Sequence, residues 1–274
     1  MVTNAERSVR SASRGSAMGA AARLGLAGRG VLYLLMGVLA LRVAFGAGGQ
    51  EADSSGAVQT LARQPGGEVM LWLLVAGLFG LALWRLAEAA FGAAGPDGHK
   101  ASARAMSLGR GVFYTGLGTT TLLFVLGARG QKSSDEQSRD LTGRAMHDLP
   151  GGRWLVLLAG VVLVGGALWM AYKSVVKRDF MDKLHVSGQA RPVVETLGRV
   201  GYAARCTVFT GVGVFLAYAG ATVDPGKAEG VDGTLRELAA APFGPWLLAV
   251  VAAGLTVFGV YSACEARWRN VTPG

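Results

Sequence analysis

Six long stretches without a charged side chain most strongly limit what this 274-residue chain can fold into. They occupy residues 30–41, 69–84, 111–128, 154–172, 206–223 and 238–264. A helix needs about 20 mostly apolar residues to cross a hydrocarbon core roughly 30 Å thick. The first two stretches are short, but arginines at their ends extend them by reaching toward the lipid headgroups. The sequence predicts an all-α polytopic membrane protein with six transmembrane helices, near 24–46, 68–91, 107–128, 153–176, 199–222 and 244–267.

Composition favours a membrane protein over a soluble one. Apolar residues make up 51% of the chain and charged residues 16%, against roughly 25% charged residues in soluble domains. Glycine accounts for 42 residues, and glycine is frequent in membrane helices. The apolar content excludes a disordered chain, and the presence of only two cysteines excludes a disulfide scaffold. A soluble all-helical core is the alternative.

The distribution of basic residues predicts the orientation, because cytoplasmic loops retain Lys and Arg. Residues 1–29, 85–110, 173–205 and 265–274 hold 18 of the 27 Lys and Arg residues. We therefore expect a multi-pass protein of the plasma membrane with both termini in the cytoplasm. Because the basic residues flank the spans, the pI near 10.0 does not indicate nucleic-acid binding.

One two-helix unit recurs three times along the chain. In the first helix of each unit an arginine is followed four residues later by an aromatic residue and then, after four more, by a glycine: Arg29/Tyr33/Gly37, Arg110/Tyr114/Gly118 and Arg205/Phe209/Gly213. A proline precedes each second helix, with a charged residue 23 positions later: Pro65/Glu88, Pro150/Lys173 and Pro242/Glu265. The units are predicted at 20–95, 101–180 and 194–270, after a basic flexible N-terminal segment, 1–19.

Each unit crosses the membrane twice, so the three units are parallel repeats. A pseudo-threefold axis along the membrane normal is their economical arrangement. A secretory signal over the first apolar stretch is an alternative for the N-terminus, and the repeat argues against its cleavage.

This organisation resembles the bacterial membrane family called domain of unknown function 1206, whose members carry up to three copies of a two-helix unit. The resemblance covers about residues 20–270. It rests on LGRVGYAAR at 197–205 and on GTLREL at 233–238 before PFG at 242–244. The middle copy departs from it, with Met106 where the others have Gly25 and Gly201, and with Lys173 where they have Glu. The resemblance implies a fold and a membrane location, and no activity.

Arg29, Arg110 and Arg205 are the candidate functional residues. They either mark the cytoplasmic boundary by holding phosphate headgroups or helix carbonyls, or converge near the axis as an anion site. Their candidate charge partners lie at the ends of the second helices: Glu88, Lys173 and Glu265. Within units, Arg29–Glu88 and Arg205–Glu265 are the pairs that we expect. Lys173 cannot pair with Arg110, which leaves the middle unit as an asymmetric binding spot, unless Lys173 simply reaches the headgroups.

Small residues at helix contacts let two membrane helices approach closely. The glycine in each arginine row therefore predicts a helix-packing contact, at Gly37, Gly118 and Gly213. No cofactor is predicted. No metal site is predicted either, because the three histidines lie in separate connections and two cysteines do not make a zinc site. These residues are His99, His147, His185, Cys206 and Cys264.

Two functions remain open, and neither is enzymatic, because no catalytic or nucleotide-binding motif occurs. The first is transport or conduction of a small solute, in particular an anion, with the three arginines in its pathway. The second is a structural or regulatory scaffold that packs against lipids or a partner membrane complex. The expected partners are the lipid bilayer, anionic lipid headgroups and either a membrane-protein partner or a second copy of the chain, but no nucleic acid.

Overall fold

A computed structural model describes residues 16–46, 50–92, 100–127 and 132–269. Across these ranges the chain is helical and contains no strand. The six long helices are α2 (Ser16–Ala44), α4 (Gly67–Phe91), α5 (Ala101–Val125), α7 (Gly152–Ala171), α8 (Ala190–Thr222) and α10 (Gly244–Trp268). Each overlaps a predicted span. Residues 1–15 of the predicted segment 1–19 lie outside the described residues, as do the predicted boundaries at 95, 128 and 270 and His99.

Three helices begin earlier than predicted: α2 at Ser16, inside the segment 1–19 that was predicted to be flexible, α5 at Ala101 and α8 at Ala190. The added residues include charged side chains, Arg23, Arg104 and Arg191, which the search for apolar runs placed outside the spans. Arg104 attaches the extension of α5 to the end of α4: it donates hydrogen bonds to the carbonyl oxygens of Ala89 (2.7 Å) and Ala90 (2.9 Å). These bonds satisfy carbonyl groups that a helix end leaves without partners. The three helices therefore extend beyond the apolar stretches that define the spans.

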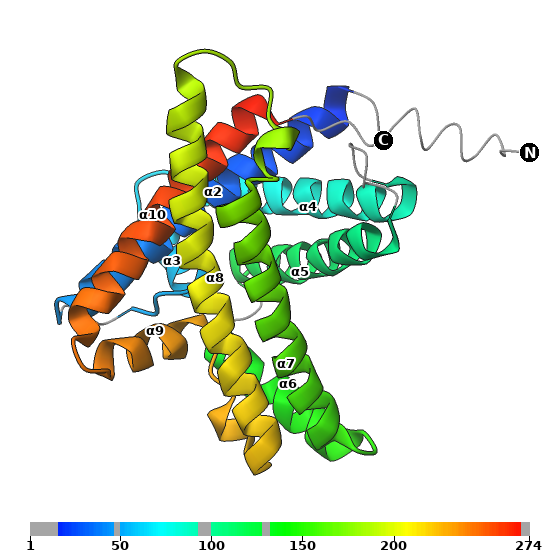
Figure 1. The fold of residues 1–274 in the computed structure, drawn as a ribbon, viewed down its shortest axis with the longest axis vertical. Helices are drawn as coiled ribbons and strands as arrows, with labels where there is room; N and C mark the ends of the chain where they lie inside the picture. Colours follow the sequence, from blue (N-terminus) through cyan, green and yellow to red (C-terminus); the bar gives the residue numbers. More distant parts are fainter. Residues whose placement is uncertain (1–15, 47–49, 93–99, 128–131, 270–274) are drawn as a thin grey trace, which may run out of the picture.

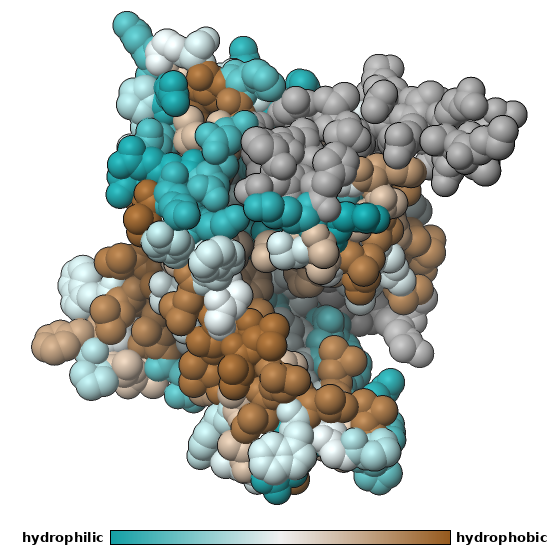
Figure 2. Space-filling view, turned by 45° about the vertical axis from the view of Figure 1, so that its right-hand side comes forward, coloured by the Kyte–Doolittle hydropathy of each residue, from teal (hydrophilic) through white to brown (hydrophobic). Residues whose placement is uncertain are grey.

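Within the described ranges, five helices are long and apolar enough to cross a membrane. They are α2 from Gly19, α4, α7 continued to Lys177, α8 and α10. The helix α5 is not among them; its apolar part carries Arg110 together with the polar residues Thr115 and 119–121, which lower its mean hydropathy. Helix length and composition thus indicate a multi-pass membrane protein. Figure 2 shows hydrophilic side chains gathered toward the top of the molecule and apolar side chains over much of the face below.

The long helices alternate in direction. In Figure 1, α2, α5 and α8 run from the top and right toward the bottom and left, and α4, α7 and α10 run back. They pack as three pairs, α2 with α10, α4 with α5, and α7 with α8; in addition α2 packs on α4 and α8 on α10. The pairs diverge in this view: α7 and α8 run nearly vertically, α4 and α5 run nearly horizontally, and α2 and α10 run diagonally.

Three short helices precede α4, α7 and α10, and the sequence analysis assigned no helix to them. They are α3 (Ser54–Ala62), α6 (Ser134–Asp148) and α9 (Val231–Ala240). Their polar composition hid them from a search for apolar runs. Asp53 caps α3 by accepting hydrogen bonds from the backbone N–H groups of Ser55 and Gly56, as an N-cap residue does.

An aspartate near the start of each short helix also binds the backbone at the start of another. We call Asp53, Asp135 and Asp232 the aspartate ring. The bonds from backbone nitrogen to carboxylate are Ser134 to Asp53 (2.6 Å), Gly230 and Gly233 to Asp135 (2.7 and 3.1 Å) and Ala52 to Asp232 (2.7 Å). Each unit is thereby joined to the next, and the third is joined back to the first. Burial raises the pKa of Asp135, against the lowering effect of its backbone hydrogen bonds.

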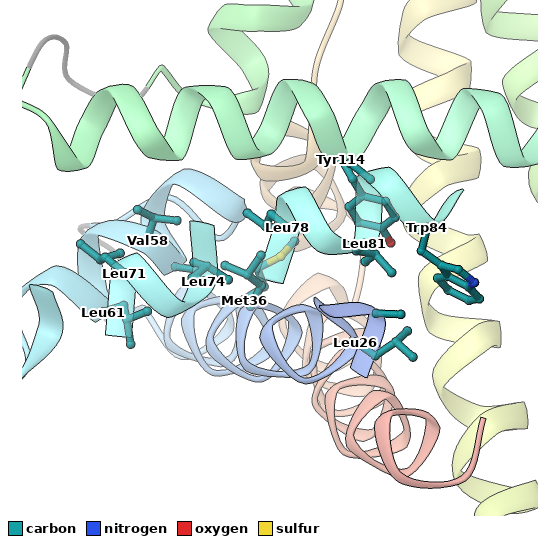
Figure 3. Packing of buried hydrophobic residues seen from close by; sticks show 14 residues of the cluster. Leu26, Met36, Val58, Leu61, Leu71, Leu74, Leu78, Leu81, Trp84 and Tyr114 are labelled. Atoms are coloured by element: carbon teal, nitrogen blue, oxygen red, sulfur yellow. The ribbon is translucent and has the colours of Figure 1, made fainter. Parts of the chain in front are cut away.

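Apolar side chains from four helices form the largest buried cluster. Met36 of α2 lies beside Leu74 of α4, Leu26 lies toward the Leu81 end of the cluster, and the Tyr114 ring of α5 lies next to Leu81 (Figure 3). A second cluster joins α2 to α8, α9 and α10. The helix α2 contributes to both clusters, so it lies at the centre of the packed part of the protein.

The turn before each second helix uses a left-handed residue, and the third unit has no glycine there. The φ angle is 74° at Gly66, 70° at Gly151 and 59° at Phe243. An L-residue in this region costs about 1–2 kcal/mol, and the Phe243 side chain is 82% exposed. Phe243→Gly is therefore expected to raise the free energy of unfolding by about 1 kcal/mol, measured by denaturant titration in detergent. Gly66→Phe is the matched reverse change, and a loss of stability in Phe243→Gly would contradict the expectation.

Candidate functional site: an arginine cluster

The three repeat arginines lie at matching depth in their helices. Arg29 and Arg110 each lie 15 residues before the last residue of their helix, and Arg205 lies 17 residues before it. At 1.5 Å per residue these intervals are about 22–25 Å. Each of the three arginines therefore lies about four turns from the helix end that leads to the aspartate ring.

Arg29 binds a carboxylate of another unit. Its Nη2 pairs with Glu265 at the end of α10, and its Nε donates to Ser262 Oγ at 3.2 Å. Glu265 pairs in addition with Arg269. The backbones of α2 and α10 approach closely at this level, since a Cβ added to Gly30 would lie 2.9 Å from the Gly259 carbonyl oxygen. The predicted pairs Arg29–Glu88 and Arg205–Glu265 are therefore wrong, because α2 presents Arg29 to the third unit.

Glu88 pairs within its own helix. Arg85 Nη1 lies 2.7 Å from Glu88 Oε2, and Ser107 Oγ of α5 donates to the same oxygen at 3.3 Å. The Trp84 ring links this pair to the Glu265 pair: the guanidinium carbon lies 4.3 Å from the ring centroid for Arg85 and 4.9 Å for Arg269. Cations over an indole face are attracted by its quadrupole.

Arg205 is held by aromatic rings instead of a carboxylate. Its guanidinium carbon lies 5.1 Å from the ring centroids of Phe209 and Phe258 and 5.6 Å from that of Tyr33. The aromatic residue of the third row thus contacts its own arginine, whereas Tyr33 of the first row contacts the arginine of the third. Arg205 also lies within electrostatic range of Arg29.

Arg110 contacts two sulfur atoms. Its Nη2 lies 3.3 Å from Met106 Sδ and 4.0 Å from Met170 Sδ of α7. It is repelled electrostatically by Arg85 and Arg205. Over the described part of the chain, no carboxylate lies within ion-pair distance of Arg110 or Arg205. The three repeat arginines therefore share one electrostatic neighbourhood, although only Arg29 has an acidic partner there.

We call these five arginines and two glutamates the arginine cluster: Arg29, Arg85, Arg110, Arg205, Arg269, Glu88 and Glu265. Counting its formal charges gives an excess of three positive charges. Five buried side-chain N or O atoms lack a hydrogen-bond partner in the described residues, and all are in the cluster or in rings beside it: Trp84 Nε1, Arg85 Nε, Arg205 Nε, Tyr261 Oη and Arg269 Nε. All five carry a proton to donate, so the cluster has an excess of donors over acceptors.

Lys173 lies apart from the cluster. It pairs with Asp179 at 3.6 Å, its Nζ lies 5.7 Å from the Trp169 ring centroid, and its side chain is partly exposed. The π-helical turn Tyr172–Lys177 places it at the polar end of α7. This is the arrangement of a lysine that reaches toward the headgroups, and it leaves the middle unit without an acid at this position.

The three row glycines each face the second helix of a neighbouring unit. A Cβ added to Gly37 would lie 2.3 Å from Thr256 Oγ1 of α10, and one added to Gly213 would lie 2.8 Å from Val164 Cγ2 of α7. At Gly118 the nearest atom would be Phe79 Cζ of α4, at 3.4 Å, an ordinary contact. The packing at Gly118, in the middle unit, is therefore looser than at Gly37 and Gly213.

Sequence analysis missed Arg85 and Arg269 as members of the cluster. Both were visible as partners of the glutamates, since Arg85 precedes Glu88 by three residues and Arg269 follows Glu265 by four. Residues three or four apart are neighbours on a helix. Among the described residues no group of three His, Cys, Asp or Glu side chains is arranged to hold a metal ion.

The fold and this cluster define a helical membrane protein in which buried and half-buried arginines outnumber the acidic side chains beside them. The family described as Domain of Unknown Function (DUF1206) matches three tandem regions, residues 24–92, 105–177 and 200–269, so the chain belongs to that family. It is similar to a protein of Bacillus subtilis (strain 168) described as "Uncharacterized protein YxxB". The two are 34% identical over 258 residues, which cover 91% of this chain and 90% of the relative. No solved structure matches.

Proposed function

We propose that the chain crosses the membrane six times, as three two-helix units around a pseudo-threefold axis, with α5 as the sixth span. Three tandem family matches support the repeat. The aspartate ring supports the axis, because each unit binds the next in one direction of rotation. The helix pairs formed between units, α10 with α2, α4 with α5 and α7 with α8, follow the same rotation. The distribution of basic residues supports cytoplasmic termini and a plasma-membrane location.

We further propose that the protein is not an enzyme and that it binds a small anion in the arginine cluster and conducts it across the membrane. The observation that carries this proposal is the set of buried donors without acceptors beside three uncompensated positive charges. An anion supplies both the missing charge and the missing acceptor atoms, and hydrogen bonds between guanidinium groups and anions are among the strongest in proteins. Charged groups at membrane depth mark ion and substrate paths.

A structural scaffold is the second candidate. The close backbone contacts at glycines favour it: a Cβ added to Gly25 would lie 2.3 Å from the Gly77 carbonyl oxygen, and one added to Gly160 would lie 2.3 Å from the Ala217 nitrogen. Contacts this close leave no room for a solute between these helices. A scaffold has lipids, a partner membrane protein or a second copy as its partners, and its arginine cluster holds the helices in place.

Anion uptake into proteoliposomes separates the two candidates. Purified protein is reconstituted, and entry of radiolabelled chloride, phosphate and sulfate is compared with entry into protein-free vesicles. We expect uptake of at least one anion, and its abolition when Arg29, Arg110 and Arg205 are all replaced by Gln, because the variant loses the charge that attracts the anion. Arg199→Gln is the control, since Arg199 is an exposed arginine of α8. Uptake that survives the triple replacement contradicts the proposal, and no uptake of any anion favours the scaffold.

A further inference from the structure

The middle unit differs from the other two in how its helices meet. The first unit packs α2 on α4 and the third packs α8 on α10, but α5 and α7 form no packed pair among the described residues. Both helices carry large apolar side chains that remain exposed, such as Phe113 of α5 and Val162 of α7. The ring of helix pairs is therefore open between α5 and α7.

The sequence explains this opening. In the closed units the helices touch at glycines: Gly25 contacts Gly77, and Gly254 contacts Ala204, next to Arg205. Counted from the repeat arginine and the repeat proline, the middle unit has Met106 where the others have Gly25 and Gly201, and Val162 where they have Gly77 and Gly254. Both larger residues are exposed, Met106 by 43% and Val162 by 63%. Side chains of this size prevent the close approach that small residues allow.

Arg110 lies at this opening. It projects from α5 to within 4.0 Å of Met170 on α7, and its other close contact is Met106. On the α7 face that carries Met170, one turn away, Gly166 has open space where a Cβ would lie. The opening thus combines apolar side chains, room beside Gly166 and a guanidinium group without an acidic partner among the described residues.

We infer that a phospholipid with an anionic headgroup binds between α5 and α7, with its phosphate on Arg110 and an acyl chain along the apolar side chains. At membrane depth these faces meet either hydrocarbon chains or another helix. The positive charge of Arg110 favours an anionic lipid over another helix. Arg110 lies about 22 Å from the end of α5 at Val125, so its guanidinium is within reach of one headgroup layer of a roughly 30 Å core. Basic pockets between transmembrane helices on the cytoplasmic side bind acidic headgroups.

This inference shares Arg110 with the proposed anion site and rests on the proposed orientation in the membrane. It does not require transport. Lipid binding is therefore measured by itself, and a protein that conducts no anion can still satisfy it.

Native mass spectrometry of the full chain, released from detergent micelles, tests the inference. The protein is equilibrated with equal amounts of phosphatidylglycerol and phosphatidylcholine. We expect a preferential phosphatidylglycerol adduct that falls about tenfold, to the phosphatidylcholine level, in Arg110→Gln, since one charge-assisted phosphate contact accounts for that factor. Arg199→Gln, which removes an exposed arginine outside the opening, should keep the adduct. In Gly166→Leu, which fills the opening without removing a charge, the adduct should fall as well.

Four outcomes would overturn the inference. They are equal adducts of the two lipids on the wild type, an unchanged adduct in both Arg110→Gln and Gly166→Leu, an equal loss in Arg110→Gln and Arg199→Gln, or a lipid-free dimer, which would place a second copy in the opening. A further arm adds excess glycerol 3-phosphate. Retention of the lipid supports the inference, and full displacement by this chain-free anion identifies a phosphate site and contradicts it. A wild-type protein that takes up anions but forms no preferential phosphatidylglycerol adduct rejects this inference alone.

Discussion

Glu265→Gln is expected to lower the free energy of unfolding by about 3–5 kcal/mol, the cost of breaking a buried ion pair by removing one partner. Glu265 is 1% exposed, and it neutralises two arginines, Arg29 and Arg269, whose side chains are 5% and 6% exposed. The replacement leaves both guanidinium groups buried in a cluster that already has an excess of positive charge. Unfolding in mixed detergent and urea, followed by circular dichroism, measures the change.

Two variants make this prediction specific. Glu237→Gln removes an exposed carboxylate on α9 and should change stability by less than about 0.5 kcal/mol. Arg29→Gln combined with Glu265→Gln removes one charge of each sign, so the double variant should recover part of the loss, as coupled residues do. A Glu265→Gln protein as stable as the wild type would mean that the cluster is solvated and that its charges are not held as described.

Gly25→Ala and Gly109→Ala are expected to change stability in opposite directions, although both add one methyl group to the first helix of a unit. At Gly25 the new Cβ would lie 2.3 Å from the Gly77 carbonyl oxygen and 2.5 Å from Leu81 Cβ, so α2 and α4 must separate. Overpacking of this kind costs about 1–3 kcal/mol. At Gly109 no atom lies within 4 Å, so Ala should add about 0.5–1 kcal/mol by its higher helix propensity.

The same unfolding measurement compares the two variants directly. Equal effects at the two positions would contradict the description of a closed first unit and an open middle unit. A stabilising Gly25→Ala would show that α2 and α4 are farther apart than the contact with Gly77 requires.

The positions of the long helices could be predicted from the sequence, because apolar length is a local property. The helices α4 and α10 begin at Gly67 and Gly244, two residues after the repeat prolines, within one residue of prediction. The short helices α3, α6 and α9 could not be found that way, because their stability comes from caps and tertiary hydrogen bonds such as those of Asp53. Such contacts join residues far apart in the chain.

The arginine rows were visible in the sequence, but their partners were not. Repeat spacing fixes how far along a helix Arg29 lies, and it does not say whether α4 or α10 will lie beside it. The pairing with Glu265 depends on the close contact between α2 and α10 at Gly30 and Gly259. The departure of the middle copy was already visible in Met106 and Lys173, and its consequence, the separation of α5 from α7, required the packing of all six long helices.

The central claim is that the arginine cluster holds a bound anion, and anomalous diffraction from crystals soaked in bromide tests it most directly. Crystals grown in the uncharged lipid monoolein avoid competition from lipid phosphate. The account predicts a bromide peak within hydrogen-bond distance of the guanidinium groups of Arg110 or Arg205, and loss of that peak when both are replaced by Gln. Guanidinium groups that point apart into the lipid headgroups, with no bromide between them, would contradict it.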